Sequence, residues 1–215
     1  MAVISEAPSE LLAYCEQWNE DMAGFESEAG QIEYIRETLP DLLSDHSLVR
    51  QILEKIAGGG AYPDVRRCGA FQNELLLYLS PEQRFSLRLY FHEPGRYTVI
   101  HDHSSWGISG TPRGELGVIR YRREDDGKRP GYARLSECGR RILSPGEVDV
   151  TLPLDRGIHQ TGSPEHRISV MLSVYGRPVR RLYFNQFDPE NNRVHRVWPP
   201  RMKKKMLAGQ ALKEM

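Results

Sequence analysis

Two histidines separated by a single residue are the side chains best suited to chemistry in this sequence. They lie in the stretch Val99-Ile-His-Asp-His-Ser-Ser-Trp-Gly107. Because side chains alternate along a strand, His101 and His103 would leave one face with Cα atoms roughly 6–7 Å apart, and Asp102 would point away. Two imidazoles at this separation can bind one metal ion, although His-x-His also arises by chance on surface strands. The spacing therefore predicts a metal site.

A third ligand is expected from another part of the chain. His159 is the best candidate, because it follows the turn residues of Pro153-Leu-Asp-Arg-Gly157. Gly95 and Gly114 flank the histidine pair and add to the metal-site interpretation. Three neutral imidazoles with open positions around a divalent ion suit iron, nickel, copper or zinc. Such a set adds no negative charge, so the ion would favour an anionic ligand such as a thiolate.

The first part of the chain has helical periodicity. Apolar residues recur three or four positions apart between about Ser9 and Ala57, and Gly58-Gly-Gly60 marks a stop. Pro40 is expected to interrupt this pattern. Because this segment holds no chemical motif, we predict a small helical cap over residues 1–60, and a partner-binding role for it stays open.

After these glycines the pattern changes to short alternating runs. Residues 84–91 and 167–175 alternate apolar and polar side chains, and turn sequences such as Glu93-Pro-Gly95 and Ser144-Pro-Gly146 separate such runs. Many short strands with regular turns favour a mainly β sandwich or barrel over residues 61–200. The basic tail, residues 201–215, has no aromatic residue, so a surface helix is a simpler interpretation than a nucleic-acid patch.

Composition limits the classes of function. Acidic and basic residues balance at 29 each, and no apolar run approaches the ~20 residues of a membrane span. We therefore expect neither nucleic acid nor a membrane as a partner. The first residues lack the pattern of a secretion signal, and Cys15, Cys68 and Cys138 are far apart, which indicates free thiols in a reducing cytoplasm. The chain would be a monomer or a homodimer.

The histidine segments resemble the two motifs of the cupin superfamily. Gly95-x5-His101-x-His103 is similar to the first motif, and Pro153-x3-Gly157-x-His159 is similar to the second. The glutamate that usually follows the second histidine is missing, since Gly107 and Ile108 hold those places. Three histidines without this glutamate resemble the thiol dioxygenases related to cysteine dioxygenase. The sequence around His101 and His103 resembles that of bacterial 3-mercaptopropionate dioxygenases. The resemblance covers about residues 85–197.

This resemblance implies a cupin double-stranded β-helix, a jelly-roll barrel, with helices at its N-terminus. The three histidines would bind Fe(2+), with nickel or zinc as alternatives in purified protein. The activity would be that of a dioxygenase that uses O2 to convert a small thiol, a mercapto-carboxylic acid, to its sulfinate. Tyr175 matches the tyrosine of the family's Ser-His-Tyr relay, but Ser173 and Met171 stand where its histidine and serine are expected. All three would face the pocket with the hydrogen-bond chain broken.

The resemblance also implies contacts to the substrate. The arginine that binds the substrate carboxylate in cysteine dioxygenase has no counterpart in Leu75–Tyr78, which disfavours cysteine as the substrate. Mercaptopropionate-type enzymes place an arginine after the tyrosine, where Arg181 stands, with Arg180 as second choice. A planar guanidinium matches a carboxylate, although a solvent-facing arginine is an equal alternative. Trp106 would form a wall of the pocket or belong to the core.

Two other classes of function stay open. The altered relay favours a metal-dependent cupin enzyme that acts on a different substrate, such as a hydrolase, an isomerase or a dioxygenase of a carbon compound. A third alternative is a non-enzymatic cupin that holds a ligand as a binding or sensor protein.

Overall fold

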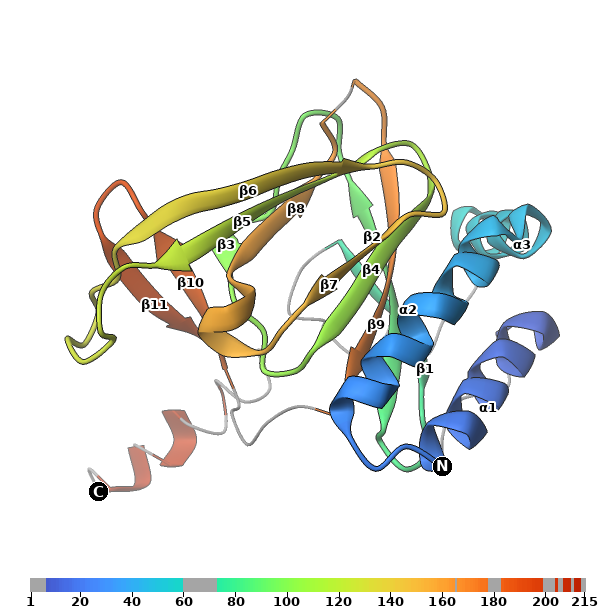
Figure 1. Ribbon diagram of the computed structural model, residues 1–215, viewed down its shortest axis with the longest axis horizontal. Coiled ribbons are helices and arrows are strands. Elements are labelled where there is room, and N and C mark those ends of the chain that lie inside the picture. Colours follow the sequence, from blue (N-terminus) through green and yellow to red (C-terminus); the bar gives the residue numbers. More distant parts are fainter. Residues whose placement is uncertain are drawn as a thin grey trace.

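The computed structural model describes residues 7–59, 73–164, 166–177, 183–198, 204, 207–209 and 211–213. Within these residues, three long helices precede the strands of a β barrel (Figure 1). The helices are α1 (Ser9–Ala23), α2 (Glu28–Ser44) and α3 (His46–Ala57). The strands are β1 (Glu74–Leu79), β2 (Phe85–His92), β3 (Ile100–His101), β4 (Gly107–Arg113), β5 (Leu116–Arg123), β6 (Leu135–Leu143), β7 (Val148–Thr151), β8 (His159–Gly162), β9 (Ser169–Gly176), β10 (Phe184–Asp188) and β11 (Arg193–Val197), with a 3-10 turn, η2 (Leu154–Gly157), before β8.

The helices form where the sequence provides caps and one apolar stripe. The Ser27 side chain accepts a hydrogen bond from the Gly30 N–H at 3.3 Å, and Asp45 accepts one from the Leu48 N–H at 2.9 Å. In Figure 1 the helices lie on one side of the molecule, where α2 contacts β4 and β7. The buried stripes are Leu11, Cys15, Trp18 and Met22 in α1, Ile35, Leu39, Leu42 and Leu43 in α2, and Leu48, Val49 and Ile52 in α3.

The prediction that Pro40 interrupts the helical pattern is wrong, because α2 continues through it to Ser44. A proline inside a helix costs about 3 kcal/mol, since its nitrogen cannot donate a hydrogen bond and its ring crowds the preceding turn. Leu42 and Leu43 follow it and are fully buried. Burying each leucine stabilises the fold by about 1.5–3 kcal/mol, so packing outweighs the local cost.

The strands form two antiparallel sheets that face each other. Their orders are β1-β2-β9-β4-β7 and β11-β10-β3-β8-β5-β6. Strands that are distant in the sequence become neighbours, as β9 does by pairing with both β2 and β4. This arrangement is a double-sheet jelly roll of the kind that cupins share. The predicted mainly β cupin fold with a small helical N-terminus is confirmed.

The two faces of the first sheet bury different kinds of residue. In β2, Phe85, Leu87 and Leu89 pack toward the helices. The alternate residues, Arg88 and Tyr90 among them, therefore face the other sheet across the barrel interior. One part of this interior is an apolar cluster of Tyr90, Leu116, Val118, Leu143 and Met171.

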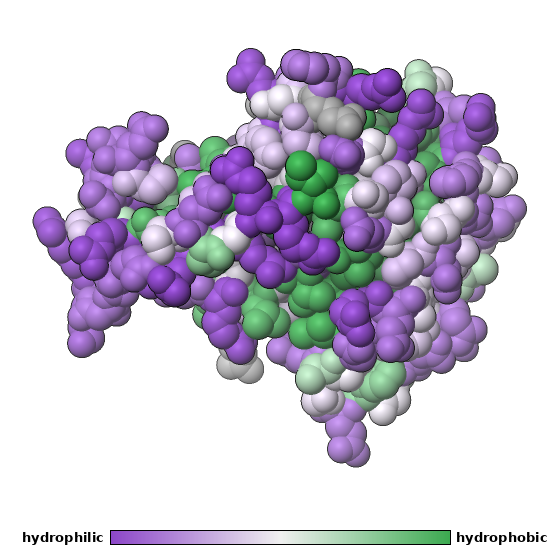
Figure 2. All heavy atoms as spheres, turned by 45° about the horizontal axis from the view of Figure 1, so that its top comes forward, coloured by the Kyte–Doolittle hydropathy of each residue, from purple (hydrophilic) through white to green (hydrophobic). Residues whose placement is uncertain are grey.

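The surface is largely hydrophilic. Figure 2 shows one face on which hydrophobic residues gather in a central band between hydrophilic ones. The described residues of the tail, 204, 207–209 and 211–213, are helical and exposed. Among the residues that the structure describes, no helix combines the length and the apolar composition needed to cross a bilayer.

Gly176, the last residue of β9, provides a test of this packing. A Cβ atom at this position would lie 2.1 Å from Cε2 of Trp106, which is fully buried. We expect Gly176→Ala to lower the free energy of unfolding by about 1–3 kcal/mol, the usual cost of overpacking a core, in urea denaturation. Gly139→Ala is the matched control, because a Cβ there meets nothing within 4 Å. Equal stability of the two variants would contradict the packing described for Trp106.

Candidate metal centre

Three imidazoles converge inside the barrel. His101 ends β3 and pairs in register with His159, the first residue of β8. His103 lies just beyond β3, and its ring centroid is 4.7 Å from that of His101. The nitrogen atoms that the three side chains offer as ligands all lie within 4.8 Å of one another. The structure thus brings together the three histidines that the spacing singled out.

The arrangement fits a single divalent ion. Nε2 of His103 and Nε2 of His159 are 3.0 Å apart, which matches neighbouring ligands about 90° apart on an ion with bonds of ~2.1 Å. Burial lowers the pKa of His101, and it lowers the pKa of His159 well below the ordinary value, with the nearby charges of His101 and Arg120 adding to the effect. Both rings are therefore held neutral, which is the form that binds a metal.

Hydrogen bonds on the side that faces away from the cluster fix the orientation of the His101 and His159 rings. Nδ1 of His101 lies 2.8 Å from the Val99 carbonyl oxygen, and Nδ1 of His159 lies 3.0 Å from Oγ1 of Thr151. When each Nδ1–H donates to that oxygen, the lone pair of Nε2 points to the centre of the cluster. Such contacts behind the ligands tune metal affinity and select the tautomer.

The segment between the first two ligands is held by its backbone and by Asp102. As predicted, Asp102 points away from the cluster, and it is fully buried. Its carboxylate accepts hydrogen bonds from the backbone N–H of Asn185 at 2.7 Å and from the Asn185 side-chain amide at 2.8 Å. The His103 carbonyl accepts a bond from the Leu154 N–H at 2.9 Å. These contacts tie the segment to β10 on one side and to η2 on the other.

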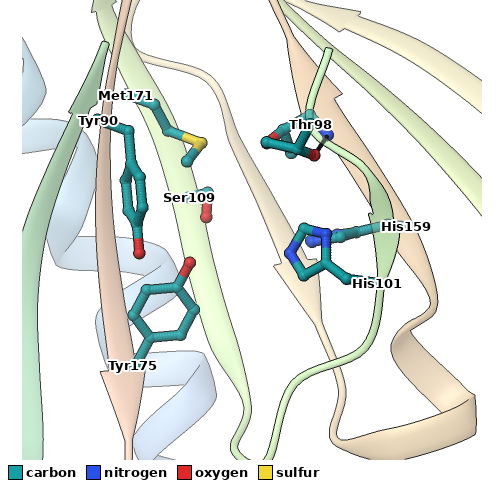
Figure 3. A pocket seen from close by; sticks show the side chains of 8 residues that line it. Tyr90, Thr98, His101, Ser109, His159, Met171 and Tyr175 are labelled. Atoms are coloured by element: carbon teal, nitrogen blue, oxygen red, sulfur yellow. Dashed lines mark hydrogen bonds between the residues drawn. The ribbon is translucent and has the colours of Figure 1, made fainter. Parts of the chain in front are cut away.

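A small cavity adjoins the histidines (Figure 3). In the view of Figure 3, residues of β2, β4 and β9 face His101 and His159, and the hydroxyls of Tyr90 and Tyr175 point toward one another. The free volume of the cavity is about 10 Å³, which is the space that one water molecule needs. The structure thus leaves room for about one water-sized group beside the histidines. The cavity is lined by Tyr90, Thr98, His101, Ser109, His159, Thr161, Met171 and Tyr175.

The three predicted residues of β9 share the interior face. Tyr175 and Met171 line the cavity, and the ring centroid of Tyr175 is 5.1 Å from that of His103. Gly107 leaves room for this ring, because a Cβ there would lie 2.8 Å from Cε1 of Tyr175. Ser173 is bonded to Ser109, with their hydroxyl oxygens 2.8 Å apart. A serine pair thus stands where the resemblance leads one to expect a histidine relay.

Trp106 lies on the opposite face. It is fully buried in the cluster between the helices and the first sheet. Since Gly107 faces the cavity, alternation turns its neighbour Trp106 away from it. This packing supports the core alternative for Trp106. Arg180 and Arg181 lie outside the described residues, so their role as a carboxylate clamp stays a prediction.

Several residues of the site were not found from the sequence. Ser109 and Thr161 line the cavity, and each lies two residues from Gly107 or His159, so alternation along the strand was a usable signal. Thr151 had none, since its contact with His159 depends on which strands become neighbours.

Comparisons with known proteins find cupin structures of low similarity. No protein-family profile matches the chain. A cupin 2 domain-containing protein from Halorhodospira halophila is 17% identical over 56% of this chain and 73% of that chain, with a TM-score of 0.40. A cupin 2 conserved barrel domain protein from Salinispora arenicola is 20% identical over 53% of this chain and 83% of that chain, with a TM-score of 0.37.

An enzyme is among these similar structures. The DMSP lyase DddQ from Ruegeria pomeroyi is 14% identical over 50% of this chain, with a TM-score of 0.36, and the match spans about half of the lyase, 48% of its chain. Because the identities and TM-scores are low, the assignment of the fold rests on the strand order, and the site rests on its own geometry.

Removing a ligand or its hydrogen-bond partner should change metal affinity by different amounts. We expect His159→Ala to abolish stoichiometric binding of Co²⁺ or Fe²⁺. We expect Thr151→Val to weaken this binding about 10- to 100-fold, which is the usual effect of removing the hydrogen-bond partner of a metal ligand. Competition with a chromophoric chelator measures both. His195→Ala removes an exposed histidine and should bind as the wild type does, and Thr151→Ser should restore affinity. Full binding by His159→Ala would refute the three-histidine site.

The contact between Asp102 and Asn185 gives a second test. In Asp102→Asn an amide would face the two N–H donors of Asn185, so we expect a loss of about 1–3 kcal/mol in stability and weaker metal binding. The exchange Asp102→Asn with Asn185→Asp restores a donor opposite an acceptor and should recover both. If the single variant binds metal normally, this contact does not position the ligands.

Proposed function

We propose that this protein is an iron(II)-dependent dioxygenase that converts a small thiol to its sulfinate. The observation that carries the proposal is the histidine cluster, which contains no carboxylate among the described residues and lies beside the cavity that Tyr175 lines. The overall reaction is RSH + O2 → RSO2⁻ + H⁺. The thiol supplies the electrons, and no external reductant is consumed.

The charge of the ligands supports an anionic substrate. A bound ferrous ion would supply Lewis-acid and redox chemistry for the thiol and O2. His101, His103 and His159 are neutral donors and leave the double positive charge of the ion uncompensated. A thiolate is therefore favoured over a neutral ligand, and its pKa falls in such a field.

The other residues of the cavity would orient the substrate and exclude water. The Tyr175 hydroxyl points into the cavity in Figure 3 and can donate a hydrogen bond there, and its proton can be held at that oxygen while charge develops on the substrate. Met171 and the ring of Tyr90 supply apolar surface on the same wall.

A second candidate is a metal-dependent enzyme that acts on a carbon compound. The bond between Ser109 and Ser173 favours it, because Ser173 stands where the relay histidine of the thiol dioxygenases is expected and is bonded to a serine instead of to Tyr175. The altered relay leaves Tyr175 without the partner that a thiol dioxygenase would provide.

Metal analysis and oxygen uptake test the function directly. The purified protein, reconstituted anaerobically with Fe²⁺, should consume O2 only when a thiol is added, and mass spectrometry should find one sulfinate formed per O2. Cysteine, 3-mercaptopropionate and mercaptosuccinate are compared in turn, and His159→Ala serves as the inactive control. Iron-loaded protein that consumes no O2 with any of these thiols would contradict the proposal and favour the second candidate.

A further inference from the structure

Tyr90 brings a second phenol hydroxyl to the cavity beside the histidines. It lies on the interior face of β2, is only 5% exposed, and pairs in register with Met171 of β9. Its neighbours Leu89 and Phe91 pack on the other face of the sheet, toward the helices. Tyr90 and Tyr175 both line the cavity. Neither the histidine spacing nor the strand pattern of the sequence assigned a role to Tyr90.

The two phenols approach each other from different strands. In Figure 3 the hydroxyls of Tyr90 and Tyr175 point toward one another, on the wall that faces the histidines. Between Met171 and Tyr175 on β9 stands Ser173, whose hydroxyl oxygen is 2.8 Å from that of Ser109. Serine side chains are short, so this row leaves space for the two rings. The cavity thus has imidazoles on one side and phenol hydroxyls on the other.

Packing fixes the direction of both hydroxyls. The ring of Tyr90 belongs to the apolar cluster of the barrel interior, and Tyr175 packs against the same cluster. On its other side, the centroid of the Tyr175 ring lies 5.1 Å from that of His103. A hydroxyl held by a packed ring can meet a bound group without a further change in the protein, which is the condition for effective stabilisation of a developing charge.

Oxygen atoms that carry negative charge are what two such donors fit. A thiolate has its charge on sulfur, whereas a sulfinate has two oxygen atoms that share the charge. Each phenol has one O–H group, and hydrogen bonds to a charged oxygen are about twice as strong as those between neutral groups. The two hydroxyls can therefore stabilise the product side of the reaction more than the substrate side.

We propose that Tyr90 is a catalytic residue, whose hydroxyl acts with that of Tyr175 to donate hydrogen bonds to the oxygen atoms that the sulfur acquires. The inference rests on the proposed function and adds to it the group that meets the new oxygens. Both tyrosines keep their protons. The reaction stays RSH + O2 → RSO2⁻ + H⁺, with the thiol as the source of electrons.

Variants that remove a hydroxyl and keep its ring test this role. They are Tyr90→Phe, Tyr175→Phe and the double variant. Tyr14→Phe on α1 is the matched control, because Tyr14 packs against Trp18 on the helical side of the first sheet, with ring centroids 6.2 Å apart. All four should bind one metal ion as the wild type does, since no histidine is changed.

Binding is measured apart from turnover, with two ligands that share an ethyl group. Cobalt(II)-loaded protein is titrated anaerobically with ethanethiol, which has no oxygen, and with ethanesulfinate, and the change in cobalt absorption gives Kd. We expect Tyr90→Phe to bind ethanesulfinate about 10-fold more weakly and ethanethiol within about 2-fold of the wild type, because a hydrogen bond to a charged oxygen is lost. The double variant should bind ethanesulfinate more weakly than either single variant.

Turnover provides a second measurement. With iron and a thiol that the wild type oxidises, Tyr90→Phe should lower kcat and leave KM unchanged, because the contact forms only as oxygen reaches the sulfur. Tyr14→Phe should change neither constant. A rise in KM with kcat unchanged would place Tyr90 in thiol binding and contradict the inference.

Failure of this inference and failure of the proposed function give different results. If the wild type oxidises a thiol but Tyr90→Phe binds ethanesulfinate normally, or loses affinity equally for both ligands, Tyr90 is not a donor to oxygen. If the double variant binds ethanesulfinate as Tyr175→Phe does, Tyr90 acts only through Tyr175, and the inference is also wrong. If the wild type oxidises no thiol, the proposed function is refuted, and the role of Tyr90 in forming a sulfinate falls with it.

Discussion

The pairing of β3 with β8 is the contact on which the site depends. It sets His101 directly opposite His159, and the extended chain after β3 then brings His103 to the same centre. A shift of one residue in this register would turn His159 away from the interior, because side chains alternate along a strand. The bonds from Asn185 to Asp102 and from Leu154 to the His103 carbonyl hold the short strand on both sides. The metal centre is therefore a property of the sheet rather than of one motif.

The surroundings of the histidines combine burial with a close approach of their ring nitrogens. A buried polar group without a partner costs about 1–3 kcal/mol, so each ring needs a partner for both of its nitrogens. Val99 and Thr151 provide one for Nδ1 of His101 and of His159. The Nε2 atoms of His103 and His159 instead face each other at 3.0 Å, where an ion would satisfy both. The barrel thus holds its ligands in place in advance of an ion.

The alternation and spacing of residues within short segments predicted much of this structure. The features that were not predicted depend on contacts between strands that are distant in the sequence. Alternation and spacing identified β2, β9 and the three histidines, because these signals lie within short segments. Two interpretations of Trp106 stayed open until Gly107 was seen to face the ring of Tyr175. The break expected at Pro40 was wrong, since burial of Leu42 and Leu43 depends on the sheet beneath the helix.

The balance of charge inside the barrel links these observations to the substrate. Glu74 pairs with Arg88, and Asp149 pairs with both Arg120 and Arg141, so these carboxylates are already engaged by arginines and do not balance the charge of an ion. The three neutral imidazoles leave a divalent ion with both of its positive charges. In a buried site of low dielectric, an uncompensated charge is costly. A thiolate that also carries a carboxylate brings two negative charges and balances the charge of the ion. A thiolate that carries an uncharged hydroxyl group instead brings only one. On the proposed function, the neutral ligand set in a buried site therefore favours a dianionic mercapto acid over a thiol that carries a single negative charge.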